Sequence, residues 1–251
     1  AYSAGTVASG PVSFMRIWDS MCATVLSTGA RRGAMMATLR CDHPDVEAFI
    51  AAKRDKSQLR HFNLSVLVTD EFMQALRDDT EWALVFPAAQ LHESDPVRSG
   101  ETVQRRWSGT DGAVPCRVLK RVRARDLWAR IMRATYDYAE PGVLFIDQVN
   151  RENNLWYRER ISATNPCGEI PLPPSEACAL GSLNLACYVG EPFSAAARFD
   201  FEGLRRITAT AVRMLDDVID ASRFPLERQR EQAQGTRRIG LTAAVGGLMF
   251  V

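Results

Sequence analysis

The sequence predicts an α/β fold. Short runs rich in Val, Leu and Ile, which are typical of strands, alternate along the chain with segments whose apolar residues recur at helical spacing. The composition, 46% hydrophobic and 24% charged, is ordinary for a globular protein. A chain of 251 residues is long enough for one large domain or two small ones.

The first predicted element is a helix over residues 11–26. Pro11 suits its first turn, and Phe14, Ile17 and Met21 widen the apolar surface beyond a single stripe. A helix that is apolar over most of its circumference is either buried or packed against a partner subunit. We therefore expect one of these two environments for residues 11–26.

Three strands are predicted in the segment that follows, at residues 34–40, 62–68 and 82–86. Asp42 is predicted to N-cap a short helix that reaches about residue 52. Thr69 and Asp70 are predicted to cap a second helix over residues 71–76. Strands and helices therefore alternate in this part of the chain.

Residues 87–117 carry Pro, Gly, Ser and mixed charges without a clear period, which predicts a long irregular connection. A cluster of basic residues, Arg105, Arg106 and residues 117–125, overlaps its end. We interpret this cluster as a solvated face, because charged side chains are mostly exposed.

The second half of the chain continues the alternation, with a helix over residues 126–138, a short buried strand over 143–146 and a polar turn over 150–154. Asp200 is predicted to N-cap the longest helix, which Pro225 ends. One face of this helix is apolar, through Leu204, Ile207, Ala211, Leu215 and Val218. Residues 237–241 are predicted to form a last strand.

The net charge of +1 gives no electrostatic reason to expect binding to nucleic acid or to an anionic membrane. No apolar run approaches the roughly 20 residues that span a bilayer. The chain starts without an initiator Met or a signal pattern and stops within an apolar stretch, so both ends are interpreted as cuts through a larger protein.

Six cysteines are present at irregular spacing, without a C-x-x-C pair, and the chain has three histidines. A zinc site is therefore not expected. A chain of this length does not need disulfide bridges, so we expect reduced thiols and a cytoplasmic protein.

The segment Asn165-Pro166-Cys167-Gly168-Glu169 brings an amide, a thiol and a carboxylate together within five residues. On extended backbone, alternate spacing would place the amide, the thiol and the carboxylate on one face. Pro and Gly disfavour a helix here and predict a stiff loop that presents the three groups together. The alternative interpretation is a proline-rich surface turn with a buried cysteine.

Several motifs in order resemble the ribonucleotide reductase catalytic subunits. Residues 165–172 (NPCGEIPL) resemble the finger loop of that family, and residues 178–185 (CALGSLNL) resemble the segment that follows it. Residues 10–15 (GPVSFM), 31–34 (RRGA) and 42–45 (DHPD) are similar to the first half of its barrel. The adenosylcobalamin-dependent class is the most similar variant, through residues 63–66 (NLSV), 141–147 (PGVLFID) and 153–156 (NNLW).

The resemblance implies a ten-stranded α/β barrel with the finger loop at its centre. Residues 1–251 would be a fragment of this single catalytic barrel domain. The family's first redox cysteine would lie before Ala1, and its phosphate-binding turn and C-terminal thiol pair would lie beyond Val251.

The resemblance also implies an activity, the reduction of ribonucleotides, expected to be diphosphates, to 2'-deoxyribonucleotides for DNA synthesis. Cys167 would carry a thiyl radical that adenosylcobalamin (vitamin B12, with its cobalt) generates. Glu169 would be the general base and Asn165 would hydrogen-bond the substrate. Cys178 would be one of two reducing thiols, renewed by a thioredoxin-type reductant. Cys22, Cys41, Cys116 and Cys187 match no catalytic position and are interpreted as small core residues.

Residues 27–36 fall where the family has its substrate-specificity loop. The resemblance implies that Ser27, Thr28, Arg31 and Arg32 link a deoxynucleotide or ATP effector to the substrate base, a task that suits arginine. The alternative is a solvated turn at a helix end. Residues 11–26 fall where the family forms its dimer, so a homodimer is expected.

Two other functional hypotheses remain open. The chain could belong to the iron-dependent class, which receives its radical from a second subunit. It could instead be a non-catalytic fragment that only binds nucleotide or dimerises. An incomplete barrel would leave strand edges open, so the 251-residue piece is expected to be inactive alone.

Overall fold

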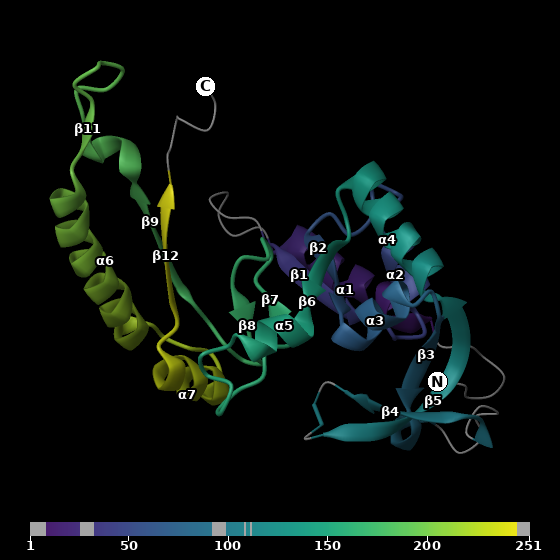
Figure 1. The fold of residues 1–251 in the computed structure, drawn as a ribbon. Coiled ribbons are helices and arrows are strands. Elements are labelled where there is room, and N and C mark those ends of the chain that lie inside the picture. The colour runs from purple at the N-terminus through teal and green to yellow at the C-terminus, as the bar shows by residue number, and fades with distance from the viewer. Residues whose placement is uncertain (1–8, 26–32, 92–98, 108, 111, 245–251) are drawn as a thin grey trace. The chain divides into compact units, whose positions relative to one another are not determined.

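The computed structural model describes residues 9–25, 33–91, 99–107, 109–110 and 112–244 (Figure 1). The chain forms two compact units, Ala1–Pro171 and Leu172–Val251, and each is considered by itself. The α/β fold class is confirmed, because both units combine helices with parallel strands.

The first unit is built on a three-stranded parallel sheet in the order β1-β2-β6, formed by β1 (Met35–Arg40), β2 (Phe62–Val68) and β6 (Gly142–Phe145). Its helices are α1 (Gly10–Thr24), α2 (Val46–Ala51), α3 (Asp70–Arg77), α4 (Ala124–Tyr138) and α5 (Ile146–Arg151). The predicted β1 and β2, and the helices corresponding to α1, α3 and α4, are therefore confirmed to within a few residues.

β2 is the central strand of this sheet, and all but one of its residues are buried. A near-continuous apolar run is typical of a parallel strand covered on both faces. Leu64 and Val66 pack in one cluster with Phe49 of α2, Phe72 of α3 and Ile131 of α4. β6 is less buried than predicted, since Phe145 at its end is 45% exposed. Part of the polar turn predicted after it belongs to α5.

An antiparallel sheet in the order β3-β5-β4 completes the first unit, with β3 (Glu81–Pro87), β4 (Thr102–Arg106) and β5 (Ala113–Arg123), and the short η1 (Ala88–Gln90) follows β3. The prediction of an irregular connection over residues 87–117 is wrong here. Exposed and half-buried residues alternate along β4, as in a strand with one face toward solvent. Polar and charged residues occupy both of its faces, so the sequence showed no hydrophobic period.

The predicted N-cap of α2 is also wrong. The helix begins at Val46 after Asp45, and Asp42 is instead fully buried in a pair with Arg40. Thr69 does cap α3, because its side chain accepts a hydrogen bond of 3.2 Å from the Phe72 amide.

The second unit contains a two-stranded parallel sheet of β9 (Ala179–Asn184) and β12 (Ile239–Ala244), with α6 (Phe201–Ala221) packed against both strands. The smaller elements are β10 (Val189–Gly190), β11 (Arg198–Phe199), η3 (Leu185–Tyr188) and α7 (Glu227–Thr236). Asp200 caps α6 as predicted, accepting a 2.8 Å hydrogen bond from the Gly203 amide.

The buried face of α6 differs in part from the predicted one. Ala211, Leu215 and Ile219 are buried, whereas Ile207 and Val218 of the predicted stripe are 38% and 43% exposed. The helix also ends at Ala221, before Pro225.

The parallel strands of the described residues form a three-stranded and a two-stranded sheet, without a closed barrel. The ten-stranded barrel is therefore not seen within them. In the same described part of the chain, every helix is too short or too polar to cross a membrane.

Candidate active site

The segment 165–169 is a loop between two short strands, β7 (Ala163–Thr164) and β8 (Pro171–Leu172), which pair with each other. Asn165 closes the neck of this loop twice. Its backbone N–H donates to the Ile170 carbonyl at 3.1 Å, and its side-chain Oδ1 accepts from the Ile170 amide at 2.9 Å. The amide oxygen of Asn165 is therefore used to shape the loop.

A tight turn forms the tip of the loop. The Gly168 amide donates to the Asn165 carbonyl at 3.0 Å, and Gly168 has a φ of +89°. Asn, Pro and Gly at the first, second and fourth positions are favoured in a type I turn, and Cys167 at the third keeps a negative φ. The prediction of extended backbone with three side chains on one face is wrong at this point, because the chain reverses direction between Asn165 and Gly168.

The segment that leads into the loop is anchored to the parallel sheet and to α5. Thr38 of β1 donates from Oγ1 to the Ser162 carbonyl at 3.4 Å. Asn150 of α5 makes two hydrogen bonds to Ile161, one to its carbonyl at 3.0 Å and one from its amide at 2.8 Å. Ile161 itself is buried beside Leu67 and Ile146. The start of the loop is thus fixed by several independent contacts.

Asn63 of β2 provides a further contact, at the tip. Its side-chain Nδ2 donates to the carbonyl of Pro166. Sequence reasoning did not assign a role to Asn63, although an amide side chain in a mostly apolar strand was a visible signal.

The loop presents a thiol and a carboxylate to solvent. Cys167 is an exposed free thiol, Glu169 is also exposed, and Asn165 is partly buried. An exposed cysteine on an anchored turn can react with a ligand that approaches the loop, whereas the alternative of a buried cysteine does not hold.

Cys178 lies in the second unit, directly before β9. It is a half-buried thiol whose Sγ lies 3.7 Å from the Ala179 carbonyl. Two residues earlier, the Glu176 side chain is fully buried, where it accepts a 2.8 Å hydrogen bond from Thr236 and pairs with Arg238 at 3.4 Å. Glu176 was missed by the sequence reasoning, because its partners are some 60 residues away.

The other cysteines differ in environment. Cys41 and Cys116 are fully buried, as predicted for core residues, and burial together with the nearby Asp42 raises the pKa of Cys41 to about 12. Cys22 is half-buried. The core prediction is wrong for Cys187, which is exposed. The predicted specificity-loop residues Ser27, Thr28, Arg31 and Arg32 lie outside the described residues.

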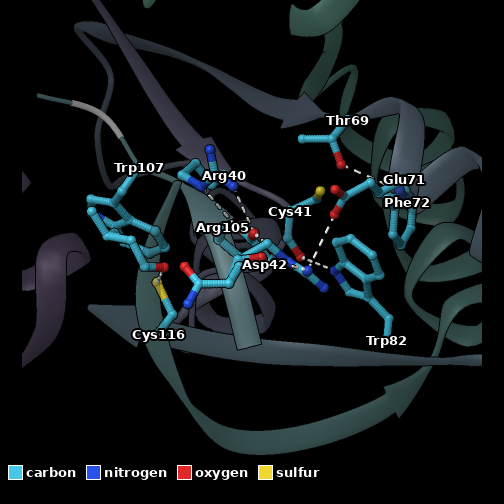
Figure 2. A network of polar contacts seen from close by, with 12 residues as sticks. Arg40, Cys41, Asp42, Thr69, Glu71, Phe72, Trp82, Arg105, Trp107 and Cys116 are labelled. Atoms are coloured by element: carbon cyan, nitrogen blue, oxygen red, sulfur yellow. Dashed lines mark hydrogen bonds and ion pairs between the residues drawn. The ribbon is translucent and has the colours of Figure 1, made fainter. Parts of the chain in front are cut away.

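A buried polar network lies at the carboxyl end of β1 (Figure 2). Arg40 binds both carboxylate oxygens of the fully buried Asp42, at 2.8 and 2.7 Å. Arg105 of β4 approaches the same carboxylate at 3.6 Å and pairs with Glu71 at 3.2 Å. The network joins the antiparallel sheet to the parallel sheet, so Arg105 departs from the predicted solvated face, although its neighbours on β5 are exposed.

A cavity of about 200 Å³ opens beside this network. Its walls include the rings of His43, Phe86 and Trp107, and Arg40 lies over the Trp107 ring at 5.0 Å. Burial lowers the pKa of His43, which favours the neutral ring. Because Asp42 balances the charge of Arg40, the cavity suits a planar, uncharged group. Its position at the carboxyl end of parallel strands is common for ligand sites.

Residues 2–249 match the model of a family described as ribonucleotide reductase, barrel domain. The chain is 42% identical over 240 residues to a vitamin B12-dependent ribonucleoside-diphosphate reductase of Mycobacterium tuberculosis, covering 95% of the chain and 30% of that relative. A protein of the same name from Thermoplasma acidophilum is 39% identical, covering 94% of the chain and 27% of the relative.

A ribonucleoside-diphosphate reductase subunit alpha of Chlamydia trachomatis is also similar, with 28% identity over 92% of the chain and 22% of that protein. The chain thus spans less than a third of the length of these curated relatives.

Proposed function

The chain belongs to the ribonucleotide reductase family, and from this premise we propose that the full-length protein reduces ribonucleotides to 2'-deoxyribonucleotides. The observation that supports this most is the exposed Cys167 thiol on an anchored turn between Asn165 and Glu169. The names of the most similar relatives favour ribonucleoside diphosphates as substrates.

Cys167 is the residue that we assign to substrate activation. As a thiyl radical, it takes the hydrogen atom from C3' of the ribose, which re-forms its S–H bond and leaves a radical on the sugar. Glu169 takes the proton of the 3'-hydroxyl, and this eases the loss of the 2'-hydroxyl as water. An S–H bond suits this exchange because it is weak enough to be broken and re-formed.

Asn165 positions the substrate in this proposal. Its Oδ1 already accepts a hydrogen bond from the Ile170 amide, so the amide nitrogen is the group assigned to the substrate hydroxyl. The loop contact therefore also sets the direction in which this donor points.

The reducing equivalents come from a pair of thiols. We assign Cys178 to this pair, with a partner cysteine from another part of the full-length protein. The two thiols give up two electrons and two protons per turnover and end as a disulfide. A thioredoxin-type dithiol then restores them by thiol–disulfide exchange.

Adenosylcobalamin is the cofactor that we propose, and when bound it supplies the radical through homolysis of its cobalt–carbon bond. The residues present fit such a nucleoside-bearing group in two respects. Cys167 is exposed, and the cavity beside His43, Phe86 and Trp107 has the size and the aromatic walls that suit a nucleobase. These three rings are the candidates to hold the adenosyl group.

The cobalamin class is favoured over the iron-dependent class by the identities. The relatives named for vitamin B12 are 42% and 39% identical, whereas the subunit alpha is 28% identical. The third hypothesis, a protein that binds nucleotide or dimerises without catalysis, gives no role to an exposed thiol held on an anchored turn.

We further propose that the protein is a homodimer and that α1 contributes to the interface. Phe14, Ile17 and Trp18 of α1 are 53%, 63% and 49% exposed, which is unusual for large apolar side chains on one helix. The specificity loop, with Thr28, Arg31 and Arg32, would follow α1 and respond to a nucleotide effector.

The deciding experiment is Cys167→Ala in the full-length protein, assayed with adenosylcobalamin, a ribonucleoside diphosphate and dithiothreitol. We expect turnover to fall to background, because the proposal gives the thiyl radical to Cys167 and alanine has no S–H bond to form it. Cys187→Ala is the matched control, since Cys187 is also exposed and has no assigned role. Nucleotide reduction by Cys167→Ala would contradict the assignment.

A further inference from the structure

We propose that Asn63 is a positioning residue that aims the Cys167 thiol by holding the peptide bond before it. This inference rests on the proposed function of Cys167 and adds a residue from β2 to the same site. The side-chain Nδ2 of Asn63 donates to the Pro166 carbonyl, which belongs to the peptide that joins Pro166 to Cys167.

The position of Asn63 in β2 suits this role. Asn63 is the one exposed residue of β2, and the five residues that follow it in the strand are all buried. Side chains alternate across a strand, so Asn63 points to the opposite face from Phe62 and Leu64, which are both in the core cluster. Asn63 contributes little to that core, and its hydrogen bond spans 103 residues of sequence to reach the loop.

The carbonyl that Asn63 binds accepts no hydrogen bond from within the turn. The Asn165 carbonyl already accepts from the Gly168 amide at 3.0 Å and from the Thr164 hydroxyl at 2.9 Å. Pro166 has no N–H and cannot tie the turn through its own nitrogen. The central carbonyl of the turn, that of Pro166, therefore takes its hydrogen bond from outside the loop.

The orientation of this central peptide decides the direction of the cysteine. A rigid peptide plane links Pro166 to Cys167, so turning the plane changes φ of Cys167 and swings its Cα–Cβ bond. Type I and type II turns differ by a flip of this plane, and type II needs a positive φ at the third residue. Cys167 keeps a negative φ, and the Asn63 amide holds the carbonyl in the corresponding direction.

Fixing this direction matters because hydrogen-atom transfer needs close contact between sulfur and the ribose C3'. A displacement of about 1 Å can lower a rate about 100-fold. Loss of the Asn63 contact would let the central peptide rotate and the turn open more often, so that its hydrogen-bonded amides exchange faster. Substrate binding would change little, because Asn63 itself is assigned no contact with the substrate.

The test uses the full-length protein with Asn63→Asp and Asn63→Ala. Asp has the shape of Asn but replaces the donor with a carboxylate oxygen, which repels the Pro166 carbonyl. Gln148→Ala is the control, since Gln148 is an exposed amide on α5 whose hydrogen bonds go to Glu152 and Arg151.

Two measurements are compared. The first is hydrogen–deuterium exchange of the peptide that contains residues 163–170, without cofactor or substrate. We expect exchange about 10-fold faster in both Asn63 variants and unchanged exchange in Gln148→Ala. The second is steady-state turnover, in which kcat should fall about 10- to 100-fold while KM stays within about 3-fold.

Wild-type exchange and wild-type kcat in Asn63→Asp would overturn the inference. So would a loss of kcat that is matched by a general loss of thermal stability, because that pattern indicates a structural role only. If the wild-type protein does not reduce ribonucleotides at all, the proposed function fails, but the exchange measurement still decides whether Asn63 holds the loop.

Discussion

Burial separates the cysteines that a reagent can reach from those that it cannot. Cys167 and Cys187 are exposed, whereas Cys41 and Cys116 are fully buried. The thiolate is the reactive form of cysteine. Burial raises the pKa of Cys41 from 9.0 to about 12, so the thiolate is far rarer there at neutral pH.

Alkylation of the native full-length protein should follow this division. With iodoacetamide at pH 8, we expect rapid modification of Cys167 and Cys187 and none of Cys41 or Cys116, measured by mass spectrometry of the peptides. Raising the pH through 9 should not accelerate modification of Cys41, because its thiol stays protonated until about pH 12. Unfolding in urea is the control, and all four should then react. Fast native labelling of Cys41 would contradict its buried position.

Asp42 is a second residue whose environment predicts a measurable effect. Its carboxylate is fully buried and faces two arginines, Arg40 at 2.7 Å and Arg105 at 3.6 Å. Asp42→Asn would leave buried guanidinium charge without a balancing anion, and breaking a buried pair costs about 3–5 kcal/mol. We expect the free energy of unfolding in urea to fall by about 3 kcal/mol.

The matched control for this change is Asp137→Asn. Asp137 pairs with Arg133 four residues earlier on α4, and Arg133 is 76% exposed, so solvent screens the pair. Its loss should cost less than about 0.5 kcal/mol. Equal losses in the free energy of unfolding for the two variants would show that burial does not increase the contribution of the Arg40–Asp42 pair to stability.

The sequence predicts local chemistry better than distant partners. Asn165 and Cys167 stand out because the motif is contiguous and its Pro and Gly residues restrict the backbone. Asn63, Glu176 and Asp42 do not, because each acquires its role from a residue that is distant in sequence or from burial that only the folded chain provides. Even within the motif, the one-face prediction failed, since a turn hydrogen bond competes with extended backbone.

At the scale of elements, the caps of α3 and α6 and the buried strand β2 were the most predictable features. β2 and α3 agree with their predicted ranges because an apolar run and a Thr-Asp cap are encoded locally. The strands β4 and β5 were missed because their pairing is between segments, and polar residues on both faces hide the period of two.

Thr69→Ala tests the contribution of a cap. The Thr69 hydroxyl accepts from the Phe72 amide at 3.2 Å, and without it this amide at the start of α3 loses its partner. We expect a loss of about 1 kcal/mol in the free energy of unfolding, measured by urea titration of the full-length protein. Thr69→Ser keeps the hydroxyl and should lose much less. If the two variants are equally destabilised, the methyl group and not the cap is responsible.

At the scale of the whole molecule, the chain matches a barrel-domain family, but its described strands do not form a barrel. Residues 2–249 match the barrel domain, yet the strands of the described residues form separate sheets and the chain spans less than a third of its curated relatives. The membership of the family could be predicted from the order of separated motifs. The described sheets do not close into a barrel, because their edge strands have no further strand to pair with among the described residues.

Activity should depend on the rest of the full-length protein. We expect the isolated 251-residue chain to show no ribonucleotide reduction with adenosylcobalamin and a dithiol, while the full-length protein turns over. In the proposed mechanism, Cys178 works with a second thiol to deliver two electrons. An unclosed sheet also leaves backbone donors and acceptors of its edge strands unpaired. Both proteins would be assayed at equal concentration for deoxynucleotide formation. Substantial turnover by the isolated chain would mean that the site is complete within residues 1–251, and that another of its own cysteines is the partner of Cys178.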